Sequence, residues 1–483
     1  MYIGIDLGTS SIKSILMNES GQIIASESVS LHISRPQALW SEQDPQEWWQ
    51  ATCQSMQTLS EKNDLSSVKA IGLSGQMHGA TLLDSKHEII RPAILWNDGR
   101  SFAECLEIES LVPESRNITG NIMMPGFTAP KIKWVQKYEP ENFAKIDKVL
   151  LPKDYVRFLL SGVFASDMSD AAGTMWMDVA ARDWSEEMLA ATGLTRNNMP
   201  ALFEGSDVTG YLHEALATQW GMQNVAIVGG AGDNAAGAIG VGVTQPKQAM
   251  LSLGTSGVYF AVSDGMLVNT ESALHSFCHA LPKTWHAMSV ILSAASCLDW
   301  VAKLTNVADV PTLLNLIEKE SNPDSQVIFL PYLSGERTPH NDPNAKGVFW
   351  GMTHETSAAD LGLAVLEGVG FALADGMEAV HSTGLIPDQV SLIGGGARSA
   401  YWRQMLSDIS NLNLVFREGG DVGPAYGAAR LAQLGVNPDA KLEQVCPEPQ
   451  IISEHTPDAN KHAVYKAKHQ SYKELYSRLK GFQ

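Results

Sequence analysis

The first residues able to do chemistry are Asp6-Leu7-Gly8-Thr9-Ser10, which follow the apolar run 2–5. A carboxylate at the end of a buried strand is costly unless a cation or hydrogen-bond donors meet it. Gly8 lets a ligand approach the backbone, and Thr9 and Ser10 add hydroxyl and N–H groups. This combination suits a hydrated Mg²⁺ and the terminal phosphates of a nucleotide. A tight hairpin with a hydrogen-bonded Asp6 is the alternative interpretation.

A second candidate is Asp233, within the glycine-rich segment 229–234 (GGAGDN). The segment lies between an expected strand at 225–228 and a helix that opens at Ala235. The helix dipole should favour an ionised carboxylate at this end. A general base needs an ionised carboxylate near the reacting atoms, and the glycines leave room for a substrate. Asp233 could equally cap the helix, and the two roles are compatible.

A third feature is a repeat, because Leu7-Gly8-Thr9-Ser10 recurs as Leu253-Gly254-Thr255-Ser256, close to half the chain further along. Both copies follow an apolar run and precede a β-rich run. The repeat predicts two related α/β domains that open with the same hairpin, although coincidence can also produce a four-residue match. Ser252 stands where the first copy has Asp6, so the second copy can cradle phosphates but cannot help to hold a metal.

Two further segments have the composition of ligand-binding turns. The run 394–399 (GGGARS) joins an expected strand at 390–393 to a helix from Tyr401, where a flat ring or a phosphate can lie on the backbone. The segments 76–79 (QMHG) and 96–98 (WND) combine amides, a carboxylate and aromatic rings, as sugar sites do. The alternatives are a tight turn for the first segment, and a loop histidine and a core tryptophan for the second.

The elements that must position these residues alternate between strands and helices, which predicts α/β layers. Expected strands include 11–17, 68–73, 89–95 and 258–262, and expected helices begin near Asp44 and cover 357–380 and 425–434. Gly and Pro interrupt the pattern at 241–248. We therefore expect two domains, residues 1–245 and 246–483, and a charged, solvated helical tail from about 455, to which no chemistry is assigned.

Composition excludes several classes of function. The 483 residues suit two domains, and a net charge of −19 disfavours nucleic acids and anionic membranes as partners. The five cysteines are scattered, without a C-x-x-C pair, as expected for a reducing compartment. Neither a secretory signal nor a long apolar run is visible, so a cytoplasmic protein is expected. P-loop and protein-kinase motifs are also missing from the sequence.

Taken in order, the segments 4–9, 232–234, 253–256 and 394–399 resemble the FGGY carbohydrate kinases, a family of the actin-like, ribonuclease H-like ATPase superfamily. The segments 331–339 (PYLSGERTP) and 131–134 (KIKW) are also similar to family motifs. The resemblance covers roughly residues 2–434. It implies two actin-like ATPase domains with a cleft between them, the use of ATP and Mg²⁺, and the homodimer that is typical of the family.

Within the family, residues 40–49, 76–79 and 95–98 are most similar to members that act on D-xylulose. The resemblance therefore implies transfer of the γ-phosphoryl group of ATP to D-xylulose, giving xylulose 5-phosphate. Alternatives are a kinase for ribulose, gluconate or glycerol, or an actin-like ATPase that serves as a chaperone, filament or sensor.

The resemblance also implies a role for each matched position. Asp233 would be the general base for the sugar's terminal hydroxyl, and Asp6 would assist Mg²⁺ through water. The phosphates would lie on Gly8, Thr9, Ser10, Gly254 and Thr255, and the adenosine on Gly395, Gly396 and Ala397. The sugar would lie among Gln76, Met77, His78, Trp96, Asn97, Asp98 and Asn234.

Overall fold

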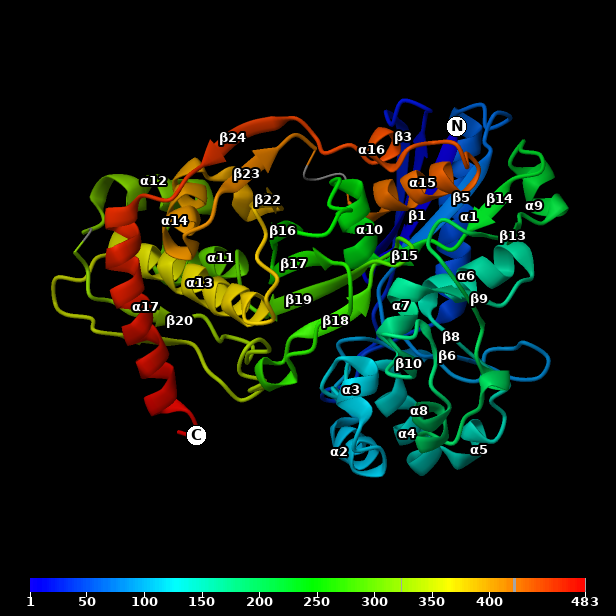
Figure 1. Ribbon diagram of the computed structural model, residues 1–483, viewed down its shortest axis with the longest axis horizontal. Helices are drawn as coiled ribbons and strands as arrows, with labels where there is room; N and C mark the ends of the chain where they lie inside the picture. Colours follow the sequence, from blue (N-terminus) through cyan, green and yellow to red (C-terminus); the bar gives the residue numbers. More distant parts are fainter. Residues whose placement is uncertain (323, 420–422, 483) are drawn as a thin grey trace.

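The computed structural model describes residues 1–322, 324–419 and 423–482, which form two α/β domains side by side (Figure 1). Each domain is built on its own seven-stranded sheet. The predicted fold class is therefore confirmed. No helix within the described ranges is long and apolar enough to cross a membrane.

The first sheet has the order β13-β14-β5-β1-β2-β3, with β15 added beside β5. β1 runs antiparallel to β2 and parallel to β5, so the predicted opening hairpin is confirmed. Asp6 lies opposite Lys13 in this hairpin. The strands are β1 (Tyr2–Leu7), β2 (Ser11–Met17), β3 (Ile23–Ser30), β5 (Ala70–Gly75), β13 (Val208–Tyr211), β14 (Ala226–Val228) and β15 (Ala231–Gly232).

The second sheet repeats this topology, with the order β18-β19-β17-β16-β22-β23-β24. β16 runs antiparallel to β17 and parallel to β22, as β1 does to β2 and β5. The sequence repeat therefore marks the same hairpin in both sheets. The strands are β16 (Gln248–Leu253), β17 (Gly257–Ser263), β18 (His275–Cys278), β19 (Trp285–Ile291), β22 (Gln389–Ile393), β23 (Leu414–Arg417) and β24 (Ile451–His455).

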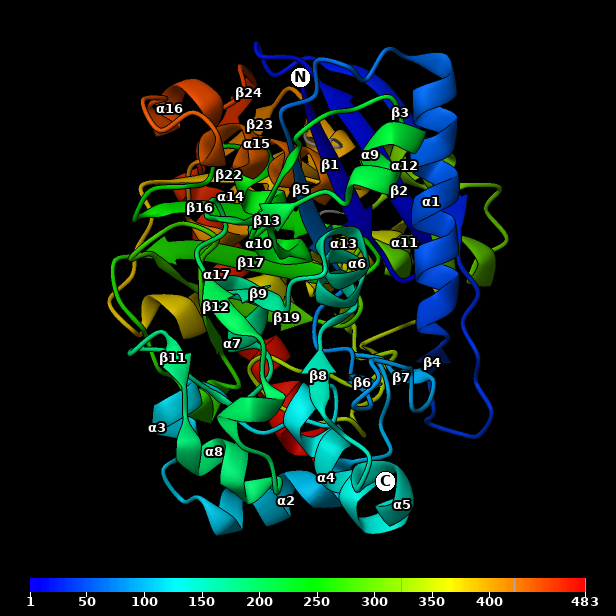
Figure 2. The same ribbon diagram turned by 90° about the vertical axis from the view of Figure 1, so that its right-hand side faces the viewer.

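Helices cover both faces of the sheets. α1 (Pro45–Lys62) begins at its N-cap Asp44, as predicted, and packs beside β2 and β3 (Figure 2). The other helices on the first sheet are α6 (Pro152–Ser161), α9 (Glu214–Gln219) and α10 (Asp233–Gly240). Those of the second domain are α11 (Ser296–Leu304), α12 (Val310–Glu320), α13 (Ala358–His381) and α14 (Ala400–Ser410). The predicted start of α13 is confirmed, since Ser357 and Asp360 form a capping box.

An insertion between β5 and β13 adds short helices and two-stranded sheets below the first sheet (Figure 1). The strand expected at 89–95 is shorter than predicted, because β7 covers only Ala93–Ile94, while Ile89 forms an isolated bridge with Leu83. The helices are α2 (Phe102–Leu111), α3 (Ser115–Thr119), α4 (Thr128–Tyr138), α5 (Pro140–Phe143), α7 (Met168–Ala172) and α8 (Glu186–Ala191). The other strands of the insertion are β6 (Thr81–Leu83), β8 (Lys148–Leu150), β9 (Ala165–Asp167), β10 (Met177–Asp178), β11 (Asp183–Trp184) and β12 (Ala201–Phe203). β7 pairs with β4 (Glu42–Gln43), which precedes α1 in the chain.

One helix of the second half lies on the first sheet. α15 (Pro424–Gly435) packs on β1 and β5 and against α10. The approach is close, because a Cβ added to Gly4 would meet the Ala425 carbonyl oxygen at 1.8 Å, and one on Gly72 would meet that of Ala428 at 2.0 Å. Small residues on both sides thus join the domains.

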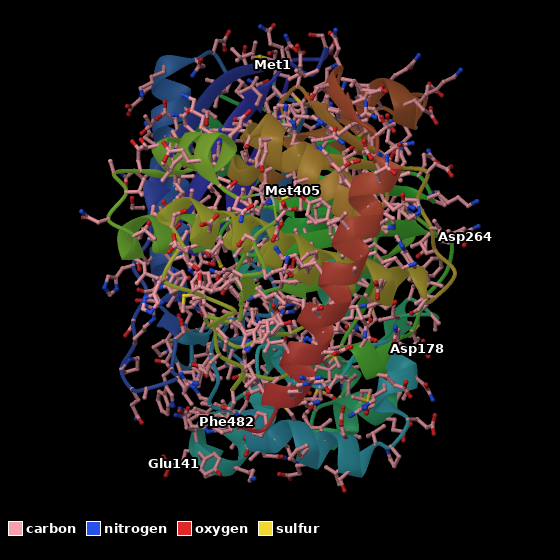
Figure 3. All side chains as sticks on the ribbon, turned by 90° about the vertical axis from the view of Figure 1, so that its left-hand side faces the viewer. Met1, Glu141, Asp178, Asp264, Met405 and Phe482 are labelled. Atoms are coloured by element: carbon pink, nitrogen blue, oxygen red, sulfur yellow. The ribbon has the colours of Figure 1, made fainter. Side chains whose placement is uncertain are left out.

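The C-terminal tail differs in part from the expectation. The predicted helix exists as α17 (Ala459–Leu479), after the strand β24, while Gln483 lies outside the described residues. α17 crosses the outer face of the second domain (Figure 3). Its side chains are not only solvated, because His469, Tyr472 and Tyr476 are buried. Tyr472 Oη lies 2.7 Å from Tyr332 Oη, so the tail holds the loop after β20 (Ile328–Leu330), which returns through β21 (Val348–Trp350).

We predict that Gly72→Ala destabilises the protein by on the order of 3 kcal/mol, because the new methyl group would force α15 away from β5. The midpoint of urea unfolding measures this. Gly237→Ala, on α10, is the matched control. A Cβ there meets nothing within 4 Å, and the change should stabilise the helix by about 1 kcal/mol. Equal effects of the two substitutions would contradict the close packing of α15.

Candidate active site

A cavity of about 340 Å³ lies between the two domains. Six residues predicted from the sequence line it: Met77, His78, Trp96, Asp233, Asn234 and Gly254. The other lining residues are Met124, Gly126, Phe127, Ser252, Ser256, Val258, His275, Phe277, Met288, Val290 and Arg337. The cavity therefore combines one carboxylate, one guanidinium, an amide and several rings, which is the composition of a small polar ligand's site.

Asp6 ends β1 with a carboxylate that is not fully satisfied. Its Oδ1 is buried without a hydrogen-bond partner among the described residues. Burial raises the pKa of Asp6 to about 7, and the negative charge of Asp233 raises it further, while Ser74 and Lys13 oppose the shift. Lys13 belongs to the site because residues paired across a hairpin project from the same face. Sequence analysis missed it, although its place in the strand after the Asp6 turn was a usable signal.

Asp233 is the first residue of α10, and Gly232 is the N-cap. The possible capping role of Asp233 is therefore wrong. Its Oδ1 accepts hydrogen bonds from Asn234 N at 2.7 Å and Asn234 Nδ2 at 2.9 Å. Burial nevertheless raises the pKa of Asp233 to about 6, so burial outweighs these donors. The ionised form is favoured less than the helix position suggested, but it still dominates at neutral pH.

The two carboxylates fit a divalent cation. They are close enough for the charge of Asp233 to raise the pKa of Asp6, and one oxygen of Asp6 lacks a partner among the described residues. Oxygen ligands and waters are what Mg²⁺ prefers, and a cation between two like charges removes their repulsion. The residues present therefore suit Mg²⁺ near Asp6.

The two copies of the repeat form turns at equivalent places, each after the first strand of its hairpin, although the second turn is one residue shorter. Gly8 N donates to Ser11 O at 3.0 Å, and Gly254 N donates to Ser256 O at 3.1 Å. The second turn reaches the cavity, which Gly254 and Ser256 line. Ser10 is exposed beside Thr9. Such paired turns can hold the anionic part of a ligand from both sides.

Thr9 links the first turn to residues predicted for a sugar site. Its hydroxyl donates to Gln76 Oε1 at 3.2 Å and accepts from Trp96 Nε1 at 3.0 Å. Gln43 Nε2 donates to the Thr9 carbonyl at 2.8 Å and Gln76 Nε2 donates to Gln43 Oε1 at 2.8 Å. Gln76 is therefore placed behind the cavity wall as a support, whereas Trp96 lines the cavity with 40% of its surface exposed.

His78 lies in the cavity wall with a left-handed backbone, at φ 68°. Its Nδ1 lies 2.8 Å from the Gly173 carbonyl oxygen, which makes Nδ1 the donor and leaves Nε2 as an acceptor. Burial, followed by the charge of Lys131, lowers the pKa of His78 to about 3. The ring therefore stays neutral and can accept a hydrogen bond from a hydroxyl group.

Lys131 explains one motif that sequence analysis noted without a role. Its side chain is buried, and Nζ donates to the His78 and Gly126 carbonyls, both at 2.7 Å. Two residues of the cavity wall thus share one ammonium group. Burial lowers the pKa of Lys131 well below its usual range.

Besides Gln76, two residues predicted for the sugar site do not line the cavity, Asn97 and Asp98. Asp98 is buried, and its oxygens accept from Ser41 N at 2.6 Å and from the Arg100 guanidinium at 2.7 and 2.9 Å. Arg100 in turn lies over the Trp40 ring, at 3.6 Å from its centroid. Asp98 therefore fixes the loop that presents Trp96. Asn97 is exposed on the same loop.

The glycine turn 394–397 follows β22, beside the end of β16. Gly394 has φ 89°, and a Cβ there would meet Leu253 O at 2.8 Å, so glycine is required. Gly395 faces open space, with nothing within 4 Å of an added Cβ. Ala397 and Gly396 pack inward, Gly396 against the Trp402 ring. Only Gly395 therefore offers open backbone, and it lies next to the turn at Gly254.

Arg337 and His275 complete the cavity from the second domain, and sequence analysis assigned them no role. Arg337 Nη1 lies 3.5 Å from His275 Nε2, and no carboxylate among the described residues forms an ion pair with Arg337. The signal available was the motif 331–339, which contains Arg337. The guanidinium is the one cation in a wall that also holds Asp233.

We predict that Asp233→Asn stabilises the unliganded protein at pH 8 by up to about 3 kcal/mol, and by much less at pH 5. The folded-state pKa of about 6 exceeds the usual 3.8, so the folded state binds more protons and loses stability as pH rises between these values. Thermal unfolding at both pH values measures this. A stabilisation that does not depend on pH would contradict the raised pKa of Asp233.

Comparisons with known proteins identify the family of this chain. Residues 1–240 match the N-terminal domain of the FGGY family of carbohydrate kinases, and residues 249–435 match its C-terminal domain. The chain is 60% identical over 479 residues to a xylulose kinase of Escherichia coli and 58% identical over 480 residues to one of Klebsiella pneumoniae, each match covering 99% of both chains. A crystal structure from Brucella ovis, named as a "xyloylose kinase", superposes with a TM-score of 0.96, 46% identity and full coverage of both chains. The chain therefore belongs to the FGGY family of carbohydrate kinases.

Proposed function

We propose that this protein transfers the γ-phosphoryl group of ATP to the terminal hydroxyl of D-xylulose, giving D-xylulose 5-phosphate. The observation that carries the proposal is the position of Asp233 in a cavity that both domains line. Gly254 of the second turn lines the same cavity, and Thr9 of the first turn accepts a hydrogen bond from Trp96 in its wall. The full-length similarity to xylulose kinases selects the sugar. Kinases for ribulose, gluconate or glycerol remain the alternatives.

In this mechanism Asp233 accepts the proton of the sugar hydroxyl as that oxygen attacks the γ-phosphorus in line. A carboxylate with a pKa near 6 is ionised at neutral pH and is more basic than an ordinary aspartate. Asn234 donates two hydrogen bonds to one carboxylate oxygen, which leaves the other oxygen to take the proton. Little covalent work is required of the protein, so positioning and charge stabilisation dominate.

The phosphates of ATP would lie between the turns at Gly8–Ser10 and Gly254–Thr255, with Lys13 near them. The adenosine would lie on Gly395, because Gly396 and Ala397 pack inward. Asp6 would hold Mg²⁺, through water. The cation would neutralise charge on the phosphates beside a carboxylate that otherwise repels them. The second turn has Ser252 in place of an aspartate, so one such site is proposed.

On the sugar side, Met77, His78, Trp96 and Asn234 would contact the xylulose directly, since they line the cavity. Gln76 and Asp98 would act one layer behind, through Thr9 and Arg100. Neutral His78 suits a hydroxyl donor, and the Trp96 ring suits an apolar sugar face. A homodimer, a cytoplasmic location and a division into domains 1–245 and 246–483 stay predictions.

We predict that the protein with ATP, Mg²⁺ and D-xylulose forms a pentulose monophosphate that mass spectrometry detects, and that Asp233→Ala lowers turnover by about 10²–10⁴-fold. ATP should still bind to Asp233→Ala, as measured by calorimetry. Asp388→Ala, an exposed carboxylate in the second domain, is the control and should keep full turnover. Full turnover in Asp233→Ala would refute the base, and faster transfer to ribulose, gluconate or glycerol would refute the sugar.

We also predict that kcat/KM for D-xylulose rises about tenfold per pH unit below about pH 6 and levels off above it, because the base must be ionised. The rates should be measured from pH 5 to 8 at saturating ATP and Mg²⁺. Dissociation constants for ATP over the same range separate nucleotide binding from proton transfer. A flat profile between pH 5 and 7 would show that no group with this pKa limits the reaction.

A further inference from the structure

Behind the segment 229–232 lies a fully buried cluster of charged side chains. Lys153 Nζ lies 2.6 Å from Asp154 Oδ1, 2.7 Å from Asp167 Oδ1 and 3.3 Å from Asp170 Oδ2. Arg157 Nη1 lies 3.3 Å from Asp154 Oδ1. Each of these side chains is 0% exposed. Five ionisable side chains at this depth are costly to bury, so their contacts with neighbouring segments are a candidate reason for their presence.

The cluster forms hydrogen bonds to both ends of the segment 229–232, which leads into Asp233. At one end, the Arg157 Nη2 donates to the Gly229 carbonyl. At the other, Gly232 N donates to Ser169 Oγ at 3.1 Å, and Ser169 Oγ donates to Asp167 Oδ2 at 2.5 Å. Lys153 orients the other oxygen of Asp167. The result is a chain of contacts from Lys153 through Asp167 and Ser169 to Gly232.

The opposite side of this segment is held by the first sheet. β15 pairs with the end of β5, with Gly232 opposite Gly75. Gly230 has φ 70°, and a Cβ there would meet Leu73 O at 1.9 Å. Gly232 is therefore fixed between the sheet on one side and Ser169 on the other. It is also the N-cap of α10, so its orientation sets the direction of the next residue, Asp233.

The charges of the cluster come close to balance. Burial raises the pKa of Asp170 well above its usual range, which favours its neutral form. Asp154 and Asp167 then offset Lys153 and Arg157. Burial alone would lower the pKa of Lys153, but the acidic groups around it, Asp154 and Asp167 first, raise it overall, so the lysine stays charged beside Asp167.

We infer that Ser169 is a positioning residue for Asp233, with its hydroxyl oriented by Asp167 and Lys153 so that Gly232 directs the carboxylate to the sugar hydroxyl. The inference rests on the proposed role of Asp233 as the general base. Small displacements of a reacting group are expensive, since an error of about 1 Å can reduce the rate about a hundredfold. The contacts from Lys153 through Asp167 and Ser169 to Gly232 would keep the Asp233 carboxylate within such a distance of its working position.

The test compares Ser169→Ala with Ser166→Ala. Both hydroxyls are buried in the same cluster, but Ser166 Oγ donates to Asp154 Oδ2 at 2.6 Å and makes no contact with residues 229–232 among the described hydrogen bonds. Both variants should therefore lose similar stability in urea unfolding. Ser169→Ala should lower kcat about tenfold with KM for ATP unchanged, and Ser166→Ala should change kcat less than twofold.

Two further measurements separate positioning from general damage. Hydrogen exchange of a peptide that covers residues 229–233 should be faster in Ser169→Ala than in Ser166→Ala, because Gly232 N loses its acceptor. Ser169→Thr, which keeps the hydroxyl, should recover most of kcat. Equal kcat in the two alanine variants, or equal exchange, would overturn the inference.

The role of Asp233 as the base is tested separately from the role of Ser169, by the turnover of Asp233→Ala. If Asp233→Ala keeps its turnover, the proposed function of Asp233 fails, whatever Ser169 does. If Asp233→Ala is inactive and Ser169→Ala matches Ser166→Ala in kcat and exchange, only the positioning role fails.

Discussion

The structure depends on one constraint: the backbone of α15 must come into direct contact with the backbones of α10 and of the first sheet. Gly427 lets the two helices touch, since a Cβ there would meet Ala236 O at 1.8 Å. Arg430 fixes the crossing, because its Nη1 donates to the carbonyls of Ile239 at 3.0 Å and Gly240 at 3.3 Å. A cation at the C-terminal end of α10 also suits the helix dipole. With both ends of α10 held, Asp233 has a fixed place relative to both domains.

The same crossing explains why two carboxylates can share the space between the domains. Side chains alternate along β1, so Asp6 projects from the face that carries Gly4, while Ile3 and Ile5 enter the core on the opposite face. The face that carries Gly4 and Asp6 is the one covered by α15 and α10. Asp6 and Asp233 are thus brought together by the alternation of one strand and the start of one helix, and their burial raises both pKa values.

Much of this was predictable from local sequence. The hairpin at Asp6, its repeat at Leu253 and the capped helix after Ser357 each follow from a short pattern, and each is present. Ala231 interrupts the glycine run 229–232 without strain, because its φ is not positive. The patterns succeed because turn, cap and strand signals depend on residues near one another in the chain.

What the sequence could not provide are contacts between distant residues. Nothing local shows that Asp98 is bound by Ser41, that Gln76 is bound by Thr9, or that α17 buries Tyr472. Lys153 and Ser169 have no motif at all, because a buried ion cluster is assembled by tertiary packing. The lining residue Arg337 lay in a motif without an assigned role for the same reason.

The placement of α15 has a consequence for biosynthesis. One face of the first sheet is covered by a helix that ends at Gly435, although the strands it covers begin at Tyr2. During translation, α15 can cover β1 and β5 only after most of the chain has left the ribosome. Contacts of such large sequence separation slow folding, and the open face is exposed to aggregation meanwhile. A chaperone would therefore protect this protein most before α15 is synthesised, while the N-terminal half is still uncovered.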